Sequence, residues 1–267
     1  PIAAQVYSVR EEPALICRNN EAAEALGYDG VELAGLYGRT PDEIKGWLDE
    51  AGLTPIGAHV PFDELDKDLE NTVRAYHSIG CSYVAIPSIS EDRRYGGSRY
   101  EEFLAAIPVI AAECRKYGMK LLYHNHGFEF EKTADGKTPL DELYASQSPE
   151  DLETELDTCW IKVAGEDPLA YLEKYRMRCP LVHIKDFIQD GEVKLVAVGD
   201  GVQDIKAIAE KAQECGAQWL VVEQDSHIFR QPDGKYEKKY LLSQKYDGIR
   251  KQQAGKWKKR ITEHEKQ

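Results

Sequence analysis

Short apolar runs alternate along the chain with longer segments in which apolar residues recur every three or four positions. The short runs, rich in β-branched residues, are typical of buried strands, and the longer segments are typical of helices that pack on one face. The pattern predicts eight strands, over residues 2–8, 28–34, 53–60, 82–87, 120–126, 152–160, 181–185 and 219–223.

Helices are predicted between these strands, over about 14–26, from Thr40 onward, and over about 63–79, 100–117, 167–175 and 204–215. Thr40 followed by Pro41 is a strong helix start, and Gly118 and Gly216 are typical helix ends. Because strand and helix alternate without an internal break, we predict a single (β/α)8 TIM barrel rather than an open doubly wound sheet. The predicted domain covers residues 1–267, with an extended C-terminal tail from about residue 226.

Composition narrows the class of protein. The 42% hydrophobic and 30% charged residues are typical of a globular protein in water, and no apolar run is long enough to span a membrane. The first residues lack the features of a signal peptide, and the six cysteines form no CxxC pair, so we expect reduced thiols and a cytoplasmic protein. The net charge of −13 argues against a nucleic-acid partner.

Polar residues gather where the predicted strands end. They are Tyr7, Arg10, Glu32, His59, His124, His126, Asp157, His183, Lys185 and Glu223. Active sites of such barrels lie on the face formed by the C-terminal ends of the strands. A single polar residue at a strand end means little, because strands end where the chain reaches solvent. Four of the seven histidines beside several carboxylates indicate a site.

Asp157, His183 and Glu223 follow three of the last strands and suggest a divalent metal. Carboxylates that converge in a partly buried mouth repel each other unless a cation compensates them. Imidazole mixed with carboxylate suits Mn²⁺, Co²⁺ or Zn²⁺ better than the all-oxygen cage that Ca²⁺ prefers. The sequence indicates the type of ligand and leaves the metal open.

Motifs along nearly the whole chain resemble one family. They are residues 5–10, 30–34, 57–60 and 123–126, Phe128-Glu129-Phe130, residues 182–186, Gly199-Asp200-Gly201 and Glu223-Gln224-Asp225. In their order and spacing the chain is similar to the xylose-isomerase-like barrels known as sugar phosphate isomerases/epimerases, with inosose dehydratase and ketose 3-epimerase relatives. The resemblance implies one divalent metal, Mn²⁺ first and Co²⁺, Mg²⁺ or Zn²⁺ as alternatives.

In that family a Glu, an Asp, a His and a second Glu bind the metal. Asp157, His183 and Glu223 match the last three ligands. His124 stands where relatives carry the first glutamate, so either His124 is a ligand or Glu129 reaches in from the following loop. We favour Glu129, which restores an acidic fourth ligand and leaves His124 to face the substrate.

The resemblance implies an isomerase or epimerase that forms an enediolate from a small sugar or keto-sugar. Glu223, His124 or His126 would remove the proton next to the carbonyl, and Lys185 would stabilise oxyanion charge. The residues expected to contact the substrate are Tyr7, Arg10, Glu32, His59 and Trp160. A metal-dependent lyase is the alternative, either an inosose or keto-sugar dehydratase or a 3-keto-glycoside eliminase. A non-catalytic binding barrel is a remote alternative, and a homo-oligomer is compatible with the sequence.

Two loops carry further expectations. Asp200 lies between Gly199 and Gly201, and Asp204 precedes a helix, so we expect this loop to repel phosphate and the substrate to be unphosphorylated. The alternative is a tight turn with Asp204 as the helix cap. Residues 229–234 are predicted to form a turn-rich loop.

Overall fold

A computed structural model describes residues 1–9, 27–224, 228–230 and 236–238. The helix predicted over 14–26, the side chain of Arg10 and the lysine-rich end of the chain lie outside the described residues.

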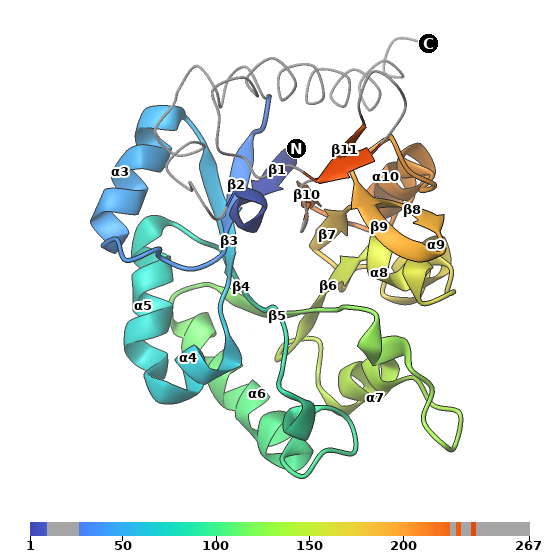
Figure 1. The fold of residues 1–267 in the computed structure, drawn as a ribbon. Helices are drawn as coiled ribbons and strands as arrows, with labels where there is room; N and C mark the ends of the chain where they lie inside the picture. Colours follow the sequence, from blue (N-terminus) through green and yellow to red (C-terminus); the bar gives the residue numbers. More distant parts are fainter. Residues whose placement is uncertain (10–26, 225–227, 231–235, 239–267) are drawn as a thin grey trace.

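Eight parallel strands close into a barrel, in the order β1-β10-β7-β6-β5-β4-β3-β2 (Figure 1). They are β1 (Ile2–Gln5), β2 (Gly30–Leu33), β3 (Thr54–His59), β4 (Tyr83–Ile86), β5 (Lys120–His124), β6 (Glu153–Asp157), β7 (Leu181–Ile184) and β10 (Trp219–Val222). The first strand pairs in parallel with the last, with Ile2 opposite Leu220, and this pairing closes the barrel. The predicted (β/α)8 fold is confirmed.

The barrel interior is built in layers. An apolar cluster spans it, formed by Ala3, Ile56, Tyr83, Ala85, Leu122, Leu181 and Val221. Side chains two positions apart on a strand share a face, so the next inward residues after Ala3, Leu122, Leu181 and Val221 are Gln5, His124, His183 and Glu223. The apolar layer thus supports a polar layer at the C-terminal end of the strands.

Helices surround the barrel (Figure 1). They are α3 (Pro41–Ala51), α4 (Phe62–Lys67), α5 (Leu69–Ile79), α6 (Tyr100–Lys116), α7 (Pro139–Ser146), α8 (Thr158–Val163), α9 (Pro168–Lys174) and α10 (Ile205–Glu214). The predicted start at Thr40 is confirmed, because its side chain and that of Glu43 form a reciprocal capping box. The outward strand faces and the buried helix faces share the main apolar core.

Several predicted boundaries were wrong. The helix expected over 63–79 is two helices, because Asp68 leaves helical geometry (φ −154°) and its carboxylate accepts hydrogen bonds from Asn71. The strand expected to reach residue 160 ends at Asp157, which caps α8. The first strand ends at Gln5, and a 3-10 turn, η1 (Val6–Val9), follows.

Several elements were not predicted. An antiparallel hairpin of β8 (Asp186–Asp190) and β9 (Glu192–Val196) follows β7, and α7 precedes β6. In the tail, part of the expected loop at 229–234 is strand, since β11 (Ile228–Arg230) pairs with β12 (Tyr236–Lys238). Two further 3-10 turns, η2 (Glu91–Arg93) and η3 (Phe128–Phe130), lie in the loops after β4 and β5.

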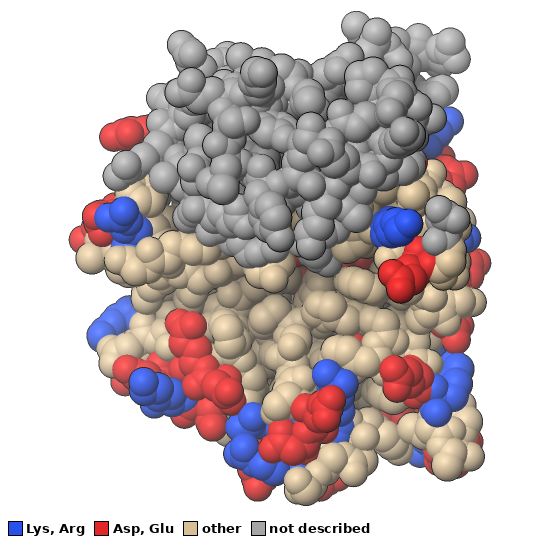
Figure 2. Space-filling view, in the orientation of Figure 1, with Lys and Arg blue, Asp and Glu red and all other residues tan. Residues whose placement is uncertain are grey.

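The surface and the cysteines agree with the composition. Figure 2 shows basic and acidic side chains interspersed over the described part of one face. None of the helices in the described ranges is long and apolar enough to cross a membrane. The five cysteines that the structure describes are free and buried (Cys81, Cys114, Cys159, Cys179 and Cys215).

Candidate active site

Four ligand-type side chains meet at the C-terminal end of neighbouring strands. They are His124 on β5, Asp157 on β6, His183 on β7 and Glu223, which follows β10. One nitrogen or oxygen atom from each lies within 4.8 Å of the others, and all four side chains are buried. Asp157 and His183 are direct neighbours in the strand register. We call these four residues the upper group.

Asp157 is held rigidly by its own backbone and by Asn125. The Asp157 Oδ1 atom accepts hydrogen bonds from the backbone N–H groups of Cys159 (2.9 Å) and Trp160 (3.1 Å). The Asn125 side chain bonds both backbone polar groups of Asp157, as a neighbouring strand would. The remaining Oδ2 atom is directed at the centre of the group, 3.7 Å from His124 Nε2.

Lys185 supplies one positive charge to this group. Its Nζ lies 3.0 Å from Asp157 Oδ2 and 2.9 Å from Glu223 Oε2. His183 Nδ1 lies 2.9 Å from the same Glu223 oxygen. Burial opposes ionisation of Glu223, but Lys185 and His183 together hold its pKa well below the usual range, so the carboxylate is ionised.

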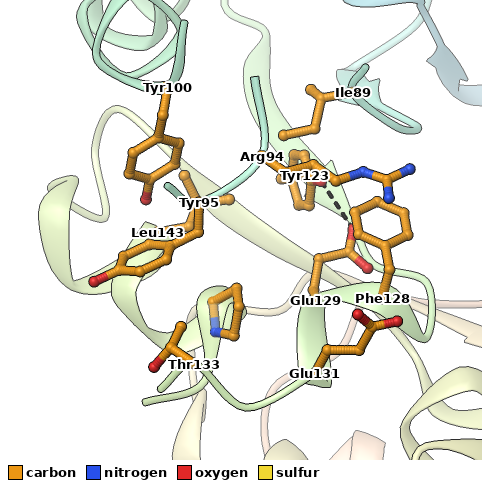
Figure 3. A pocket seen from close by; sticks show the side chains of 11 residues that line it. Ile89, Arg94, Tyr95, Tyr100, Tyr123, Phe128, Glu129, Glu131, Thr133 and Leu143 are labelled. Carbon is orange, nitrogen blue, oxygen red and sulfur yellow. Dashed lines mark hydrogen bonds between the residues drawn. The ribbon is translucent and has the colours of Figure 1, made fainter. Parts of the chain in front are cut away.

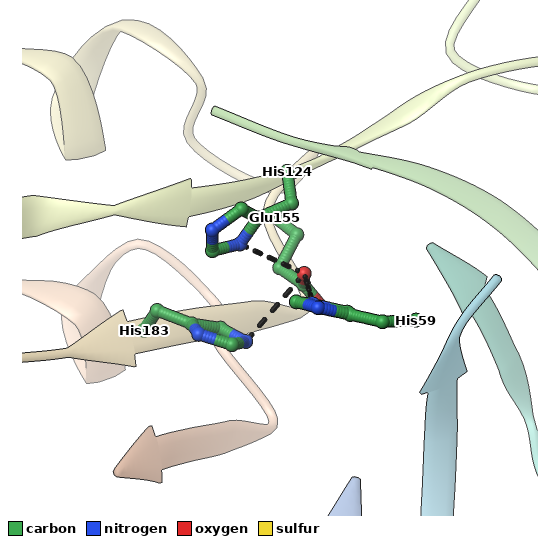
Figure 4. A group of neighbouring side chains, drawn as sticks. All are labelled: His59, His124, Glu155 and His183. Carbon is green, nitrogen blue, oxygen red and sulfur yellow. Dashed lines mark hydrogen bonds and ion pairs between the residues drawn. The ribbon is translucent and has the colours of Figure 1, made fainter. Parts of the chain in front are cut away.

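A second set of buried polar residues lies against the same two histidines (Figure 4). Glu155 Oε2 lies 2.7 Å from His59 Nε2, 3.1 Å from His124 Nδ1 and 3.5 Å from His183 Nε2. Glu32 Oε2 lies 2.8 Å from His183 Nε2 and accepts a hydrogen bond from Gln5 Nε2 (2.8 Å). We call Glu32, His59, His124, Glu155 and His183 the lower group, which shares His124 and His183 with the upper group.

The two glutamates of the lower group have pKa values shifted in opposite directions. Burial and the nearby charge of Glu155 raise the pKa of Glu32 to about 7. Burial also opposes ionisation of Glu155, but His183 and His59 hold its pKa well below the usual range. For His59 and His183, burial favours the neutral ring, yet the two carboxylates overcome it and raise the pKa of each. The lower group therefore places the ionised Glu155 carboxylate between two histidines whose protonated form it favours.

These residues fit a divalent cation. Four buried carboxylates, Glu32, Glu155, Asp157 and Glu223, lie at this end of the barrel, and Lys185 is paired with two of them, Asp157 and Glu223. Glu32 and Glu155 each also keep one oxygen that accepts no hydrogen bond among the described residues. Excess negative charge in a water-poor interior is stabilised by a metal ion, and mixed imidazole and carboxylate ligands suit Zn²⁺, Mn²⁺ or Co²⁺.

Glu129, the expected fourth ligand, belongs to neither group. Its carboxylate accepts hydrogen bonds from Tyr123 Oη and from the His126 backbone N–H, both 2.8 Å. It lines a separate cavity of about 180 Å³, together with Arg94, whose guanidinium stacks on Phe128 (Figure 3). Successive strand residues face opposite sides, so Tyr123 and Glu129 lie across β5 from the His124 ring. Burial raises the pKa of Glu129 to about 7.

The other predicted residues lie at different distances from the centre. The His126 ring is 5.0 Å from the His124 ring and 6.0 Å from that of Trp160, measured between centroids. Burial and Lys185 lower the pKa of His126 to about 4, so its ring is neutral. Lys185 Nζ lies 5.9 Å from the Trp160 ring centre. Tyr7 is 41% exposed at the mouth.

Comparison with known proteins identifies the family. The family model described as xylose isomerase-like TIM barrel matches residues 21–245. The chain belongs to the xylose isomerase-like TIM-barrel family. The resemblance inferred from the sequence motifs is thus confirmed.

The names of similar proteins indicate more than one activity within this family. The chain is 26% identical over 256 residues to an inosose dehydratase of Lacticaseibacillus casei, covering 80% of this chain and 85% of that protein. Among solved structures, a sugar phosphate isomerase/epimerase of Parabacteroides distasonis superposes with a TM-score of 0.74 at 22% identity, covering 98% and 93% of the two chains. The IOLI protein, solved with a zinc atom, superposes with a TM-score of 0.66 at 15% identity, covering 97% of each.

The sequence analysis missed three residues of this xylose isomerase-like site, namely Gln5, Asn125 and Glu155. A signal for Glu155 was present, because Glu155 precedes Asp157 by two positions on one strand and therefore shares its inward face. Asn125 acts only through backbone groups of Asp157, and no spacing along the sequence indicates that contact.

Proposed function

We propose that this protein is a divalent-metal-dependent enzyme that removes a proton next to the carbonyl of a sugar or keto-sugar. The observation that carries the proposal is the upper group, four buried metal-type ligands at the catalytic end of the barrel. The activities named for its relatives, dehydration of an inosose and isomerisation or epimerisation of a sugar phosphate, share that first step.

His124, Asp157, His183 and Glu223 would hold the metal. The upper and lower groups share His124 and His183, and a neutral imidazole offers one lone pair, so both groups cannot be filled at once. The upper group includes the two carboxylates that Lys185 bridges, and it adjoins His126 and Trp160. When bound there, the cation would polarise the substrate carbonyl.

Two side chains of the chain can move protons at this site. His126 is neutral, and its Nδ1 is buried without a hydrogen-bond partner in the described structure, so it can accept the proton of the substrate. Lys185 is buried between Asp157 and Glu223, where its ammonium can stabilise oxyanion charge or donate a proton to a departing hydroxyl.

The fate of the deprotonated carbon decides between two classes of enzyme. Two-base epimerisation needs a second acid or base facing the same carbon. Glu129, favoured from the sequence as the fourth metal ligand, does not supply it, because it lies across β5 against Tyr123. Elimination of a β-hydroxyl needs one base and one acid, which His126 and Lys185 provide. We therefore place a lyase acting on a keto-sugar or inosose first and the isomerase or epimerase second, the reverse of the order favoured by the sequence.

The loop after β9 supports a substrate without phosphate. The Asp186 carboxylate accepts hydrogen bonds from the backbone N–H groups of Phe187, Gly199, Gly201 and Gln203, at 2.9–3.0 Å. These amides, which could otherwise bind phosphate, already bind an anion of the chain itself. Asp204 caps α10 through Ala207, as the alternative interpretation of this loop expected.

The test is an activity panel on chelator-treated protein, with Mn²⁺, Co²⁺, Mg²⁺ or Zn²⁺ added back. Inososes, keto-sugars and 3-keto-glycosides would be incubated in D₂O beside the matching sugar phosphates. We expect metal-dependent deuterium exchange next to the carbonyl and a product one water lighter. Exchange with a stereoisomeric product of unchanged mass would favour the epimerase. Absence of exchange with every metal, or a clear preference for sugar phosphates, would contradict the corresponding part of the proposal.

Lys185→Met and His126→Gln separate the two protein groups in that assay. Lys185→Met is expected to retain deuterium exchange while losing most of the elimination, because the donor to the departing hydroxyl is gone. His126→Gln is expected to lose both, by about 10²–10⁴-fold for a missing general base. Val109→Ala on the exposed face of α6 serves as the control, with both rates near those of the wild type.

A further inference from the structure

Each histidine shared by the two groups faces carboxylates with both ring nitrogens. His183 directs Nδ1 at Glu223 (2.9 Å) and Nε2 at Glu32 (2.8 Å). His124 directs Nε2 toward Asp157 Oδ2 (3.7 Å) and Nδ1 at Glu155 (3.1 Å). A neutral imidazole carries one proton, and its position decides which nitrogen can bind a metal.

We propose that Glu32 and Glu155 are positioning residues, which keep the metal-facing nitrogen of His183 and of His124 free of its proton. The inference rests on the metal site proposed above. It assigns Glu32 a role behind the ligands, in place of the substrate contact expected from the sequence.

For His183 the argument follows from donor and acceptor chemistry. When Glu32 is ionised its carboxylate only accepts hydrogen bonds, and in that state the 2.8 Å contact places a proton on His183 Nε2. The proton that a metal displaces is then the one on Nδ1, beside Glu223. Gln5 donates to the same Glu32 oxygen, and this contact fixes the carboxylate in place.

For His124 the acceptor is Glu155. A carboxylate 3.1 Å from Nδ1 requires the proton on that nitrogen and leaves Nε2 on the side of Asp157. His59 Nε2 donates to the same Glu155 oxygen (2.7 Å) and lies 3.5 Å from Glu32, so this ring holds the Glu155 carboxylate in place beside His124. The His59 ring stacks on that of His183 at 5.2 Å.

A second metal within the lower group is the competing explanation. His59, His124, Glu155 and His183 also bring one ligand atom each within 4.8 Å (Figure 4). That ion would need His124 Nδ1 and His183 Nε2, the two nitrogens that the positioning role protonates. The two explanations therefore predict different stoichiometries and different effects of changing Glu155.

Graded variants test the positioning role. Glu32→Gln and Glu155→Gln keep the volume and weaken the acceptor, whereas Glu32→Met and Glu155→Met remove the acceptor altogether. Glu153→Gln is the matched control, since it lies on the same strand as Glu155 and pairs with Lys120 rather than with a histidine. Binding of Mn²⁺, Co²⁺ and Zn²⁺ would be measured by calorimetry, and folding of the metal-free proteins by thermal denaturation.

We expect one metal per chain, with an affinity that falls in the order Glu, Gln, Met. Loss of an acceptor behind a ligand typically weakens metal binding about 10–100-fold. The control should bind as the wild type does. Nitrogen NMR of the Zn²⁺-loaded protein should show His183 bound through Nδ1 with a proton on Nε2, and a mixture of nitrogens in Glu32→Met. A purely structural role would lower the melting temperature without changing the bound nitrogen.

The outcomes separate the two proposals. A wild type that binds no metal would contradict the proposed function and the positioning role together. A wild type that binds one metal, with equal affinity in all the Glu32 and Glu155 variants, would overturn only the positioning role. Two metals in the wild type, one of them lost in Glu155→Gln, would show that Glu155 is a ligand. If a variant unfolds, Glu155→Asp, which keeps the charge but withdraws it from both rings, provides the same comparison.

Discussion

Replacing Asp186 with Asn should destabilise the protein more than any other single Asp-to-Asn change in this loop region. The Asp186 side chain is fully buried and binds four backbone N–H groups with its two oxygens. Asparagine is nearly isosteric, but only one of its two terminal groups accepts hydrogen bonds. Two of the four amides would therefore face an NH₂ group instead of an oxygen.

The magnitude follows from the two lost contacts. A hydrogen bond to a charged group contributes about 1.5–3 kcal/mol, so the free energy of unfolding should fall by about 3–4 kcal/mol after partial relaxation of the loop. For a domain of this size that loss lowers the melting temperature by roughly 10 °C. The loop has little room to relax, because its backbone at Gly201 is packed directly against Asp186 Oδ1. A Cβ atom at this position would collide with that oxygen.

Urea denaturation followed by circular dichroism measures this change, with Asp204→Asn as the matched control. Asp204 makes a single cap bond at the start of α10, where Asp and Asn are equally good caps, so its loss should stay within about 0.5 kcal/mol. A loss below about 1 kcal/mol in Asp186→Asn would refute the reasoning, since the loop would then close without the carboxylate.

Three further predictions concern the metal and the buried acids. Asp157→Asn and His183→Ala should each lose the metal while the far-ultraviolet circular dichroism stays that of the wild type; full metal content in both, measured by elemental analysis, would exclude the upper group. His124→Asn should weaken metal binding more than Glu129→Gln does, because only His124 lies among the ligands, and calorimetry giving the reverse order would restore Glu129 as the fourth ligand. Burial raises the pKa of Glu129 to about 7 from an unfolded value near 4.5, so its neutral form stabilises the fold fully below the unfolded value and this stability is lost as the pH rises toward 7. Glu129→Gln removes this negative contribution, so the slope of unfolding free energy against pH, measured on metal-free protein over this range, should be more positive by up to about 1.4 kcal/mol per pH unit. Equal slopes would show that Glu129 does not titrate there.

The barrel could be predicted because each strand carries its own signal. Runs such as Tyr83–Ile86 are apolar on both faces, as expected of strands that have helices outside and a packed core inside. The hairpin of β8 and β9 was missed because its residues alternate weakly, and the buried carboxylate of Asp186, which organises the following loop, looks like any acidic residue after a strand. Its four donors come from positions that only the folded loop brings together.

The part of the candidate site that could be predicted consists of residues that directly end or follow a strand. Asp157, His183 and Glu223 each follow an apolar run, and the structure brings these three together with His124. The fourth proposed ligand was harder to predict, because His124 and Glu129 lie only five residues apart in the sequence. The direction of the Tyr123 side chain, which the sequence does not show, decides between them. The Tyr123 side chain faces the helices and donates a hydrogen bond to Glu129. This bond keeps Glu129 on the side of β5 opposite the His124 ring.

A single barrel strand can place more than one functional residue in the barrel interior. Three acidic residues share one face of β6, and each has a different environment. Glu153 lies beside Lys120 at the end of the barrel, Glu155 lies among three histidines, and Asp157 belongs to the upper group. Apolar side chains of neighbouring strands, such as Leu122 and Leu181, close the interior beneath the histidines. The carboxylate at the middle position, Glu155, lies 3.1 Å from His124 Nδ1, and its proposed role is to decide where that ring carries its proton. The alternation along such a strand therefore predicts a ligand and the residue that orients a ligand, two positions apart.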